Sequence, residues 1–193
     1  MRRSLLAVVL ALPCSAALPA WWRELPRQPA LASRFTQESD SAVFGKLRQT
    51  GTLVLARGGR LRVDYASGLR VLADGRQLVQ YDPDTRTAQR MDLTQAVRDF
   101  PLLGLLLEPA RVEALFRVEP LPGDAVRLVP RGPDLPQIQV EGRNGLLKAL
   151  AWTDPTGARQ RLELLDPRVP PRPAPETFRF DPPKGTRWAS AER

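Results

Sequence analysis

The stretch that most constrains the fold runs from residue 51 to residue 91, where short apolar segments alternate with turn signals. The turn signals are Arg57-Gly58-Gly59, Ala66-Ser67-Gly68, Asp74-Gly75 and Asp82-Pro83-Asp84. Glycine and Asp-Gly pairs supply the positive φ that hairpin turns need, and proline presets a turn φ. The pattern therefore predicts a meander of antiparallel strands with one apolar face.

The first hairpin of this stretch can be checked for a consistent register. A two-residue loop at 58–59 would set apolar residues opposite charged ones. A three-residue loop at 57–59 sets Leu55 opposite Leu61 and Leu53 opposite Val63, so that one face is apolar throughout. The apolar pattern favours the three-residue loop, which leaves Arg57 in the turn at the rim of the sheet. The opposite face then carries Arg60, Arg62 and Asp64.

The N-terminus has the residue order of a secretory signal peptide. Arg2 and Arg3 precede an apolar run at 5–12, and small residues follow at 15–17. The run is too short to span a bilayer, and no later stretch is long and apolar enough to do so. We expect cleavage after Ala16 or Ala17, with residues 1–17 as signal peptide and 18–193 as one exported domain.

Cys14 is the only cysteine of the chain, and it lies within the expected signal peptide. A lipoprotein signal also places a cysteine here but requires a small residue just before it, and Pro13 occupies that position. We therefore favour cleavage without lipid attachment. The mature chain would then have no disulfide and no thiol chemistry.

The chain is basic, with a formal net charge of +8, of which Arg2 and Arg3 supply two. Its arginines are scattered singly along the expected strands and loops, with no basic block interleaved with aromatic residues. This distribution argues against a nucleic-acid site. It remains compatible with a weak attraction to anionic membrane surfaces.

The residues that usually carry catalysis are missing or explained by turns. The chain has no histidine, which removes the commonest general base and metal ligand. Most acidic residues sit in turn sequences, where hydrogen bonds to the backbone account for them. The G-x-S-x-G, G-x-x-x-x-G-K-[ST] and G-x-G-x-x-G motifs do not occur. We expect no catalytic residues, no metal, no cofactor and no enzyme activity.

The rest of the chain predicts helices followed by more strands. Short helices are expected near 21–25 and 30–35, and again at 93–97, 102–107 and 109–115. The run at 102–107 is apolar all round and must be covered by other parts of the protein. Further strands are expected at 35–38, 116–119, 126–129, 137–141, 146–153 and 159–165, with a closing strand at 178–180. About ten or eleven strands in one sheet must curl into a barrel or half-barrel.

Such a curled sheet can hold a hydrophobic ligand under apolar helices. The alternative is that the helices fill the interior as an ordinary core, and the pattern alone favours this alternative.

Several pieces of sequence, in a shared order and spacing, resemble the LolA family of periplasmic outer-membrane lipoprotein carriers. They are Phe35-Thr36-Gln37, 51–57, 60–65, Ala73-Asp74-Gly75, Tyr81-Asp82-Pro83, 101–107, 154–157, 178–180 and 182–185. The resemblance covers almost all of the mature chain. It implies a mainly β fold, with a single curled antiparallel sheet forming an unclosed β-barrel whose cavity is lidded by short helices.

The resemblance also implies a function and partners. A carrier of this family accepts triacylated lipoproteins from an inner-membrane LolCDE-type ABC transporter, shields their acyl chains and passes them to an outer-membrane LolB-type receptor. The protein would be a monomer. The family's functional arginine falls on Arg57, which would hold the lid helices closed until acyl chains enter. The family usually has proline directly after this arginine, where this chain has Gly58.

On this interpretation two sets of residues surround the ligand, beside Arg57. The expected wall of the sheet consists of Leu53, Leu55, Leu61, Val63, Val71, Leu78, Val79, Tyr81 and Met91. The expected lid consists of Leu102, Leu103, Leu106 and Leu107.

Three other hypotheses stay open at this point. A lipid-anchored LolB-like receptor of similar fold would require a lipidated Cys14. A periplasmic lipoprotein sensor would require a further regulatory domain, and an envelope hydrolase would require measurable turnover.

Overall fold

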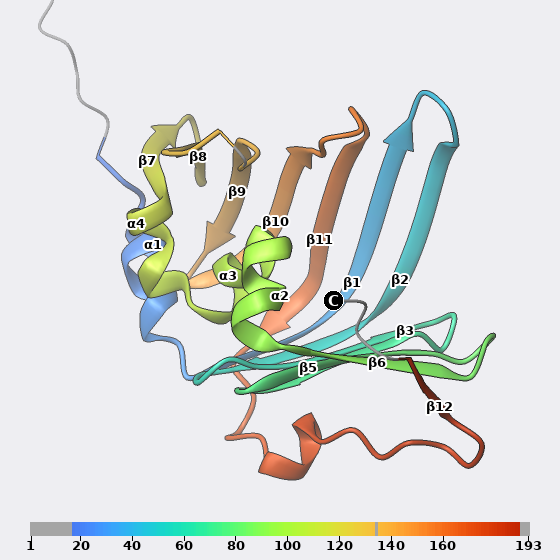
Figure 1. Ribbon diagram of the computed structural model, residues 1–193. Coiled ribbons are helices and arrows are strands. Elements are labelled where there is room, and N and C mark those ends of the chain that lie inside the picture. Colours follow the sequence, from blue (N-terminus) through green and yellow to red (C-terminus); the bar gives the residue numbers. More distant parts are fainter. Residues whose placement is uncertain (1–16, 134, 190–193) are drawn as a thin grey trace, which may run out of the picture.

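A computed structural model describes residues 17–133 and 135–189 of the chain. These residues form one sheet that curls around short helices (Figure 1). The strand order is β12-β6-β5-β4-β3-β2-β1-β11-β10-β9-β8-β7, so β12 and β7 are the two edges. Every pair is antiparallel except β12 with β6. Residues 1–16 of the expected signal peptide, including Cys14, lie outside the described residues.

The elements have the following bounds. The strands are β1 (Ala30–Ser41), β2 (Gly45–Ala56), β3 (Arg60–Tyr65), β4 (Arg70–Asp74), β5 (Gln77–Asp82), β6 (Thr87–Asp92), β7 (Phe116–Leu121), β8 (Ala125–Pro130), β9 (Ile138–Arg143), β10 (Leu146–Thr153), β11 (Arg159–Arg168) and β12 (Arg187–Ala189). The α-helices are α1 (Ala20–Glu24), α2 (Leu93–Asp99), α3 (Pro101–Leu107) and α4 (Val112–Leu115). The 3₁₀ helices are η1 (Leu25–Arg27), η2 (Pro109–Arg111) and η3 (Pro175–Phe178).

The expected fold class, a single curled and unclosed antiparallel sheet with short helices, is confirmed. The described residues hold twelve strands, one more than the upper expected number. The first hairpin has the expected register, with Leu55 opposite Leu61 and Leu53 opposite Val63. Gly58 and Gly59 have φ angles of 80° and 71°, which explains why this loop requires two glycines.

The expected helical turn at 30–35 is wrong, because β1 begins at Ala30 and runs for 12 residues. This segment pairs with β2 on one side and largely with β11 on the other. Leu31 packs in the main core, while Ala30 packs in a separate cluster with Phe178. Burial on both faces of the sheet therefore overrides the local helical preference of this alanine-rich sequence.

The expected closing strand at 178–180 is also wrong, since η3 ends at Phe178 and the last strand is Arg187–Ala189. We call residues 175–189 the C-terminal strap, because they cross the convex face of the sheet below β3–β6 (Figure 1). Phe178 is only 2 % exposed and packs with Ala30 and Ala56. The strap thus covers the sheet with side chains instead of extending it with strand 178–180.

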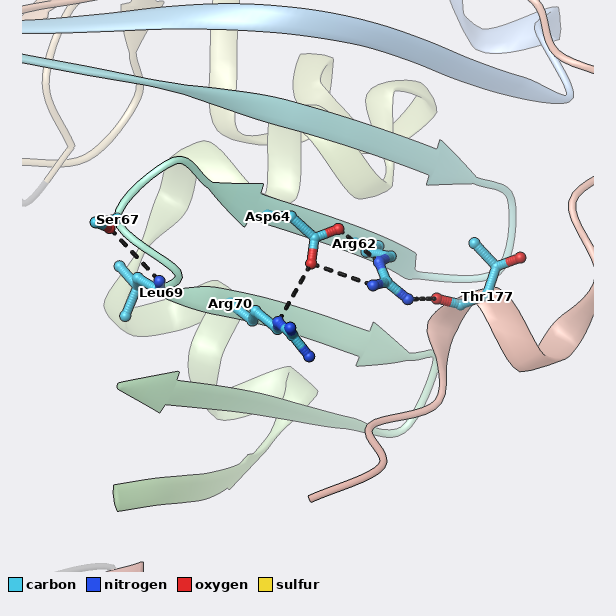
Figure 2. A network of polar contacts seen from close by, with 6 residues as sticks. All are labelled: Arg62, Asp64, Ser67, Leu69, Arg70 and Thr177. Carbon is cyan, nitrogen blue, oxygen red and sulfur yellow. Dashed lines mark hydrogen bonds and ion pairs between the residues drawn. The ribbon is translucent and has the colours of Figure 1, made fainter. Parts of the chain in front are cut away.

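Charged groups on the convex face fasten the strap (Figure 2). The Arg62 guanidinium donates to both carboxylate oxygens of Asp64, at 2.6 and 3.2 Å, and to the Thr177 carbonyl at 3.2 Å. Arg70 lies 3.7 Å from the same carboxylate. Arg62, which was expected on this face, and Arg70 therefore neutralise Asp64, and Arg62 also holds η3 against β3.

On the concave side, α2 and α3 lie within the curl of the sheet (Figure 1). The main core joins leucines of α3 to apolar residues of strands at both ends of the sheet, from Leu78 in β5 to Val140 in β9. Among residues 17–133 and 135–189, no helix is long and apolar enough to cross a membrane.

Candidate functional site

An apolar cavity of about 290 Å³ lies between the concave face of the sheet and α3. We call it the central cavity. Its lining comes from strands β1–β6, β10 and β11, and from Phe100 and helix α3. The lining residues are Phe35, Gln37, Leu53, Leu61, Val63, Tyr65, Val71, Leu78, Gln80, Met91, Phe100, Leu102, Leu103, Leu106, Leu150, Trp152 and Leu162.

Strand register builds the wall of this cavity. Residues directly opposite each other on neighbouring strands share one face of the sheet. One row crosses β2–β5 as Leu53, Val63, Val71 and Gln80. A second row continues from Leu61 through Ala73 and Leu78 to Met91. Four hairpins in succession therefore place side chains from different strands side by side.

The lid is a pair of short helices joined at Phe100. The Asp92 carboxylate caps α2 by accepting from the Thr94 and Gln95 amides, and Pro101 takes the first position of α3. A Cβ added at Gly104 would lie 3.2 Å from Val97, so this glycine lets the two helices approach closely. Leu102, Leu103 and Leu106 then face the central cavity, while Leu105 and Leu107 line other pockets.

Few polar groups reach the cavity. The Tyr65 hydroxyl donates to the side-chain carbonyl of Gln37 at 3.2 Å, and burial raises the pKa of Tyr65 above its ordinary value. The tyrosine therefore stays neutral at physiological pH, and none of the described residues that line the cavity is charged. Such a lining suits an uncharged, apolar ligand.

Arg57 lies at the rim in a second pocket of about 360 Å³, which we call the rim pocket. Its Nε donates to the Gln28 carbonyl at 3.3 Å and its Nη2 to the Pro26 carbonyl at 3.0 Å. These carbonyls belong to the segment that contains η1, and the other side of the pocket is formed by residues 105–111. Arg57 therefore bonds η1, and α3 lies across the rim pocket from it.

The structure brings nine of the expected wall and lid residues together around the central cavity. They are Leu53, Leu61, Val63, Val71, Leu78, Met91, Leu102, Leu103 and Leu106. Leu55 and Leu107 are buried beside Arg57 in the rim pocket instead.

The expected positions of Val79 and Tyr81 are wrong. Side chains alternate along a strand, so Leu78 and Gln80 face the cavity while Val79 and Tyr81 face the convex side. There they form a cluster with Ala88, against which Phe180 of the C-terminal strap packs. Their apolar character reflects burial under the strap.

The sequence argument missed eight lining residues, among them Phe35, Tyr65, Leu150 and Trp152. Phe35 and Tyr65 meet edge to face, with ring centroids 5.2 Å apart. Leu150 and Leu162 are paired across β10 and β11, well beyond the end of the meander at Met91. Alternation within β10 and β11 was the available signal, but it does not reveal which strands lie beside the lid.

The described residues contain no group of three or more His, Cys, Asp or Glu that could hold a metal ion. The site is the mostly apolar central cavity on the concave side of an open sheet, covered by leucines of the short helix α3. The fold and the cavity together define the class of open β-barrels with an apolar interior.

Comparison with known proteins identifies the family within this class. Residues 29–181 match the family model described as outer membrane lipoprotein carrier protein LolA, and the chain belongs to this family. The chain is 28% identical over 173 residues to the outer-membrane lipoprotein carrier protein of Halorhodospira halophila, covering 88% of this chain and 82% of that protein. It is 29% identical over 145 residues to the protein of the same name from Bordetella avium, covering 71% and 69%.

Solved structures support the fold alone. The crystal structure of an uncharacterized conserved protein from Thermus thermophilus superposes with a TM-score of 0.54 at 12% identity. The match covers 88% of this chain and 96% of that one.

Proposed function

We propose that this protein is a periplasmic carrier that encloses the acyl chains of outer-membrane lipoproteins and delivers them to a receptor at the outer membrane. The observation that carries the proposal is the apolar central cavity under α3, in a chain of the LolA family. The names of its relatives, which describe outer-membrane lipoprotein carriers, support the same cargo.

The energetics of the cargo explain why such a cavity is needed. Moving an acyl chain out of water is worth about 0.8 kcal/mol per CH₂, or roughly 12 kcal/mol for a chain of about sixteen carbons. Free lipoprotein would therefore not cross an aqueous compartment in useful amounts. A carrier must shelter this surface and still release it.

The size of the cavity indicates a closed lid. Its 290 Å³ lies near the lower end of the roughly 300–1,000 Å³ typical of ligand pockets. Leu102, Leu103 and Leu106 line the cavity from the side of α3. We infer that α3 moves away from the sheet when cargo enters, and that these leucines then contact the acyl chain.

Arg57 is suited to stabilise the closed state indirectly. Its two side-chain hydrogen bonds fix the carbonyls of Pro26 and Gln28, and η1 packs against η2, the segment that follows α3. A planar guanidinium presents its donors in a fixed fork, so it loses less side-chain entropy than a lysine would in holding two carbonyls. Loss of these bonds would loosen the support on which the C-terminal end of α3 rests.

The Arg57→Leu variant tests this role. We expect it to load lipoprotein from a LolCDE-type transporter but to pass cargo to a LolB-type receptor several-fold more slowly, because the closed, cargo-free state that drives release is weakened. The measurement is a two-component transfer assay. Arg23→Leu is the matched control, since Arg23 is an exposed arginine of the neighbouring helix α1. Hand-over by Arg57→Leu at the rate of the control would rule out the proposed role.

The cargo itself is tested by purification from periplasm followed by mass spectrometry of bound material. Triacylated protein in one-to-one complex with the chain is expected. Recovery of the chain with free fatty acid or with no lipid from cells rich in lipoproteins would contradict the proposal.

A further inference from the structure

The turn between β1 and β2 carries the most exposed large apolar side chains of the described residues. Val43 is 80 %, Phe44 89 % and Leu47 58 % exposed. A single exposed apolar residue is ordinary, but three within five consecutive residues make a patch. We call Val43, Phe44 and Leu47 the hairpin tip.

The hairpin tip projects beyond the rest of the sheet. β2 pairs with β1 along its whole length from Gly45, but with β3 only from Gly51 onward. Residues 45–50 therefore extend past the end of β3, and the β1–β2 turn lies at the end of the hairpin remote from the helices (Figure 1). Nothing in the described structure covers it.

The hairpin tip is continuous with the wall of the central cavity. The register of β1 with β2 is unbroken, so Leu47 lies on the same concave face as Leu53. Its partner Ser39 is two residues from Gln37, which lines the cavity. With a rise of about 3.3 Å per residue, the turn begins about 13 Å beyond Gln37. The concave face between the cavity and the tip carries uncharged polar side chains, among them Gln37, Ser39 and Gln49.

The opposite, convex face of the same strands is mainly cationic. In the two rungs of the ladder nearest the turn, strand alternation and register place four basic and two acidic residues there, and Glu163 follows one rung further from the turn. They are Lys46, Arg48, Arg159 and Arg161, with Glu38 and Asp40. The hairpin thus has uncharged groups on its inner face, apolar side chains at its tip, and a net positive outer face next to the turn.

We propose that the hairpin tip inserts into the surface of an anionic phospholipid bilayer and brings the mouth of the central cavity to it. A protein partner fits the tip less well, because a specific interface needs roughly 800 Å² per partner and a complementary surface. A protruding turn of three apolar side chains offers neither. A bilayer accepts such a turn without shape complementarity, and its phosphates attract the flanking cations.

Flotation of the exported protein with lipid-only vesicles tests the proposal. Vesicles of phosphatidylethanolamine and phosphatidylglycerol should bind the protein, and added salt should weaken the binding. The Val43→Ser/Phe44→Ser double variant should bind at least about tenfold more weakly, because it loses two inserted side chains. Val169→Ser is the control, since Val169 is 43 % exposed but lies at the other end of the sheet's long strands.

A second variant reports insertion directly. Phe44→Trp should show tryptophan fluorescence that brominated phospholipids quench, above the quenching of the unaltered protein, whereas Val169→Trp should not.

Two results would overturn the proposal: no binding of the unaltered protein to these vesicles, or equal binding by the double variant. A double variant that fails only in transfer to a purified receptor would assign the tip to a protein contact instead. Because acyl-chain binding is measured separately with a fatty-acid probe, a failure here is distinguishable from a failure of the carrier function.

Discussion

At the scale of single residues, strand alternation decides which side chains can meet a ligand. Val71 and Val79 both belong to the apolar pattern of the meander, yet Val71 lines the central cavity and Val79 lies under the C-terminal strap. Composition does not distinguish them. Their environments differ only because one position faces the concave side and the other the convex side.

This difference yields a matched pair of substitutions. Val71→Thr keeps the side-chain volume and adds a hydroxyl to the cavity wall, so we expect the affinity for a fluorescent fatty acid to fall about fivefold, the effect of roughly 1 kcal/mol. Val79→Thr should leave that affinity unchanged and lower the free energy of unfolding by about 1–2 kcal/mol. Equal effects of the two variants on affinity would contradict the assignment of the cavity.

Glycine positions add a second constraint at this scale. A Cβ at Gly142 would lie within 2.6 Å of three ring atoms of Trp21, so this glycine lets α1 pack flat on β9. The sequence around Gly142 does not indicate that Trp21 packs against it. This contact explains why a helix of five residues can be held in place without a side-chain cap.

At the scale of elements, the pairing of strands that are close in sequence was predictable. The position of the C-terminal strap over distant strands was not. The register of β2 with β3 follows from the positions of Leu53, Leu55 and the glycines, all within a dozen residues. The position of the C-terminal strap depends on partners more than a hundred residues away, such as Arg62 with Thr177. The local pattern therefore predicted a strand at 178–180, whereas Phe178 and Phe180 pack their rings against the convex face of the sheet.

The anchoring of the strap can be measured with Phe178→Ala. Removing a ring that is 2 % exposed should lower the free energy of unfolding by about 3–5 kcal/mol, as for other buried aromatic residues. Fatty-acid affinity, measured well below the unfolding temperature, should not change because the ring lies on the convex side. Chemical denaturation of both proteins gives the comparison. A loss below about 1 kcal/mol would show that the strap is only loosely held.

At the scale of the whole molecule, one core joins the two halves of the sheet. Leu61 and Leu78 from the meander belong to the same buried cluster as Leu128, Ile138 and Val140 from the later strands. The number of strands predicted a curled sheet, but only the family resemblance, and not the apolar pattern, implied a cavity between the helices and the wall. A filled core and a lined cavity produce the same apolar periodicity in the sequence. They differ only in how closely the helices pack on the sheet.

A shared core predicts cooperative unfolding. Thermal melts followed by the circular dichroism of the sheet and by tryptophan fluorescence should coincide, because Trp21, Trp22 and Trp152 all contact the main cluster. Two separated transitions would indicate that the β7–β10 half folds independently of the meander.

The ladder of strands begins at β12 and stops at β7, and across residues 17–133 and 135–189 these two edges do not pair. A closed β-barrel could widen only if backbone hydrogen bonds between two neighbouring strands broke. An open sheet can widen at its two unpaired edges while every existing strand pair stays intact. The interior of such a sheet can therefore widen by bending of the strands, without broken β-pairing.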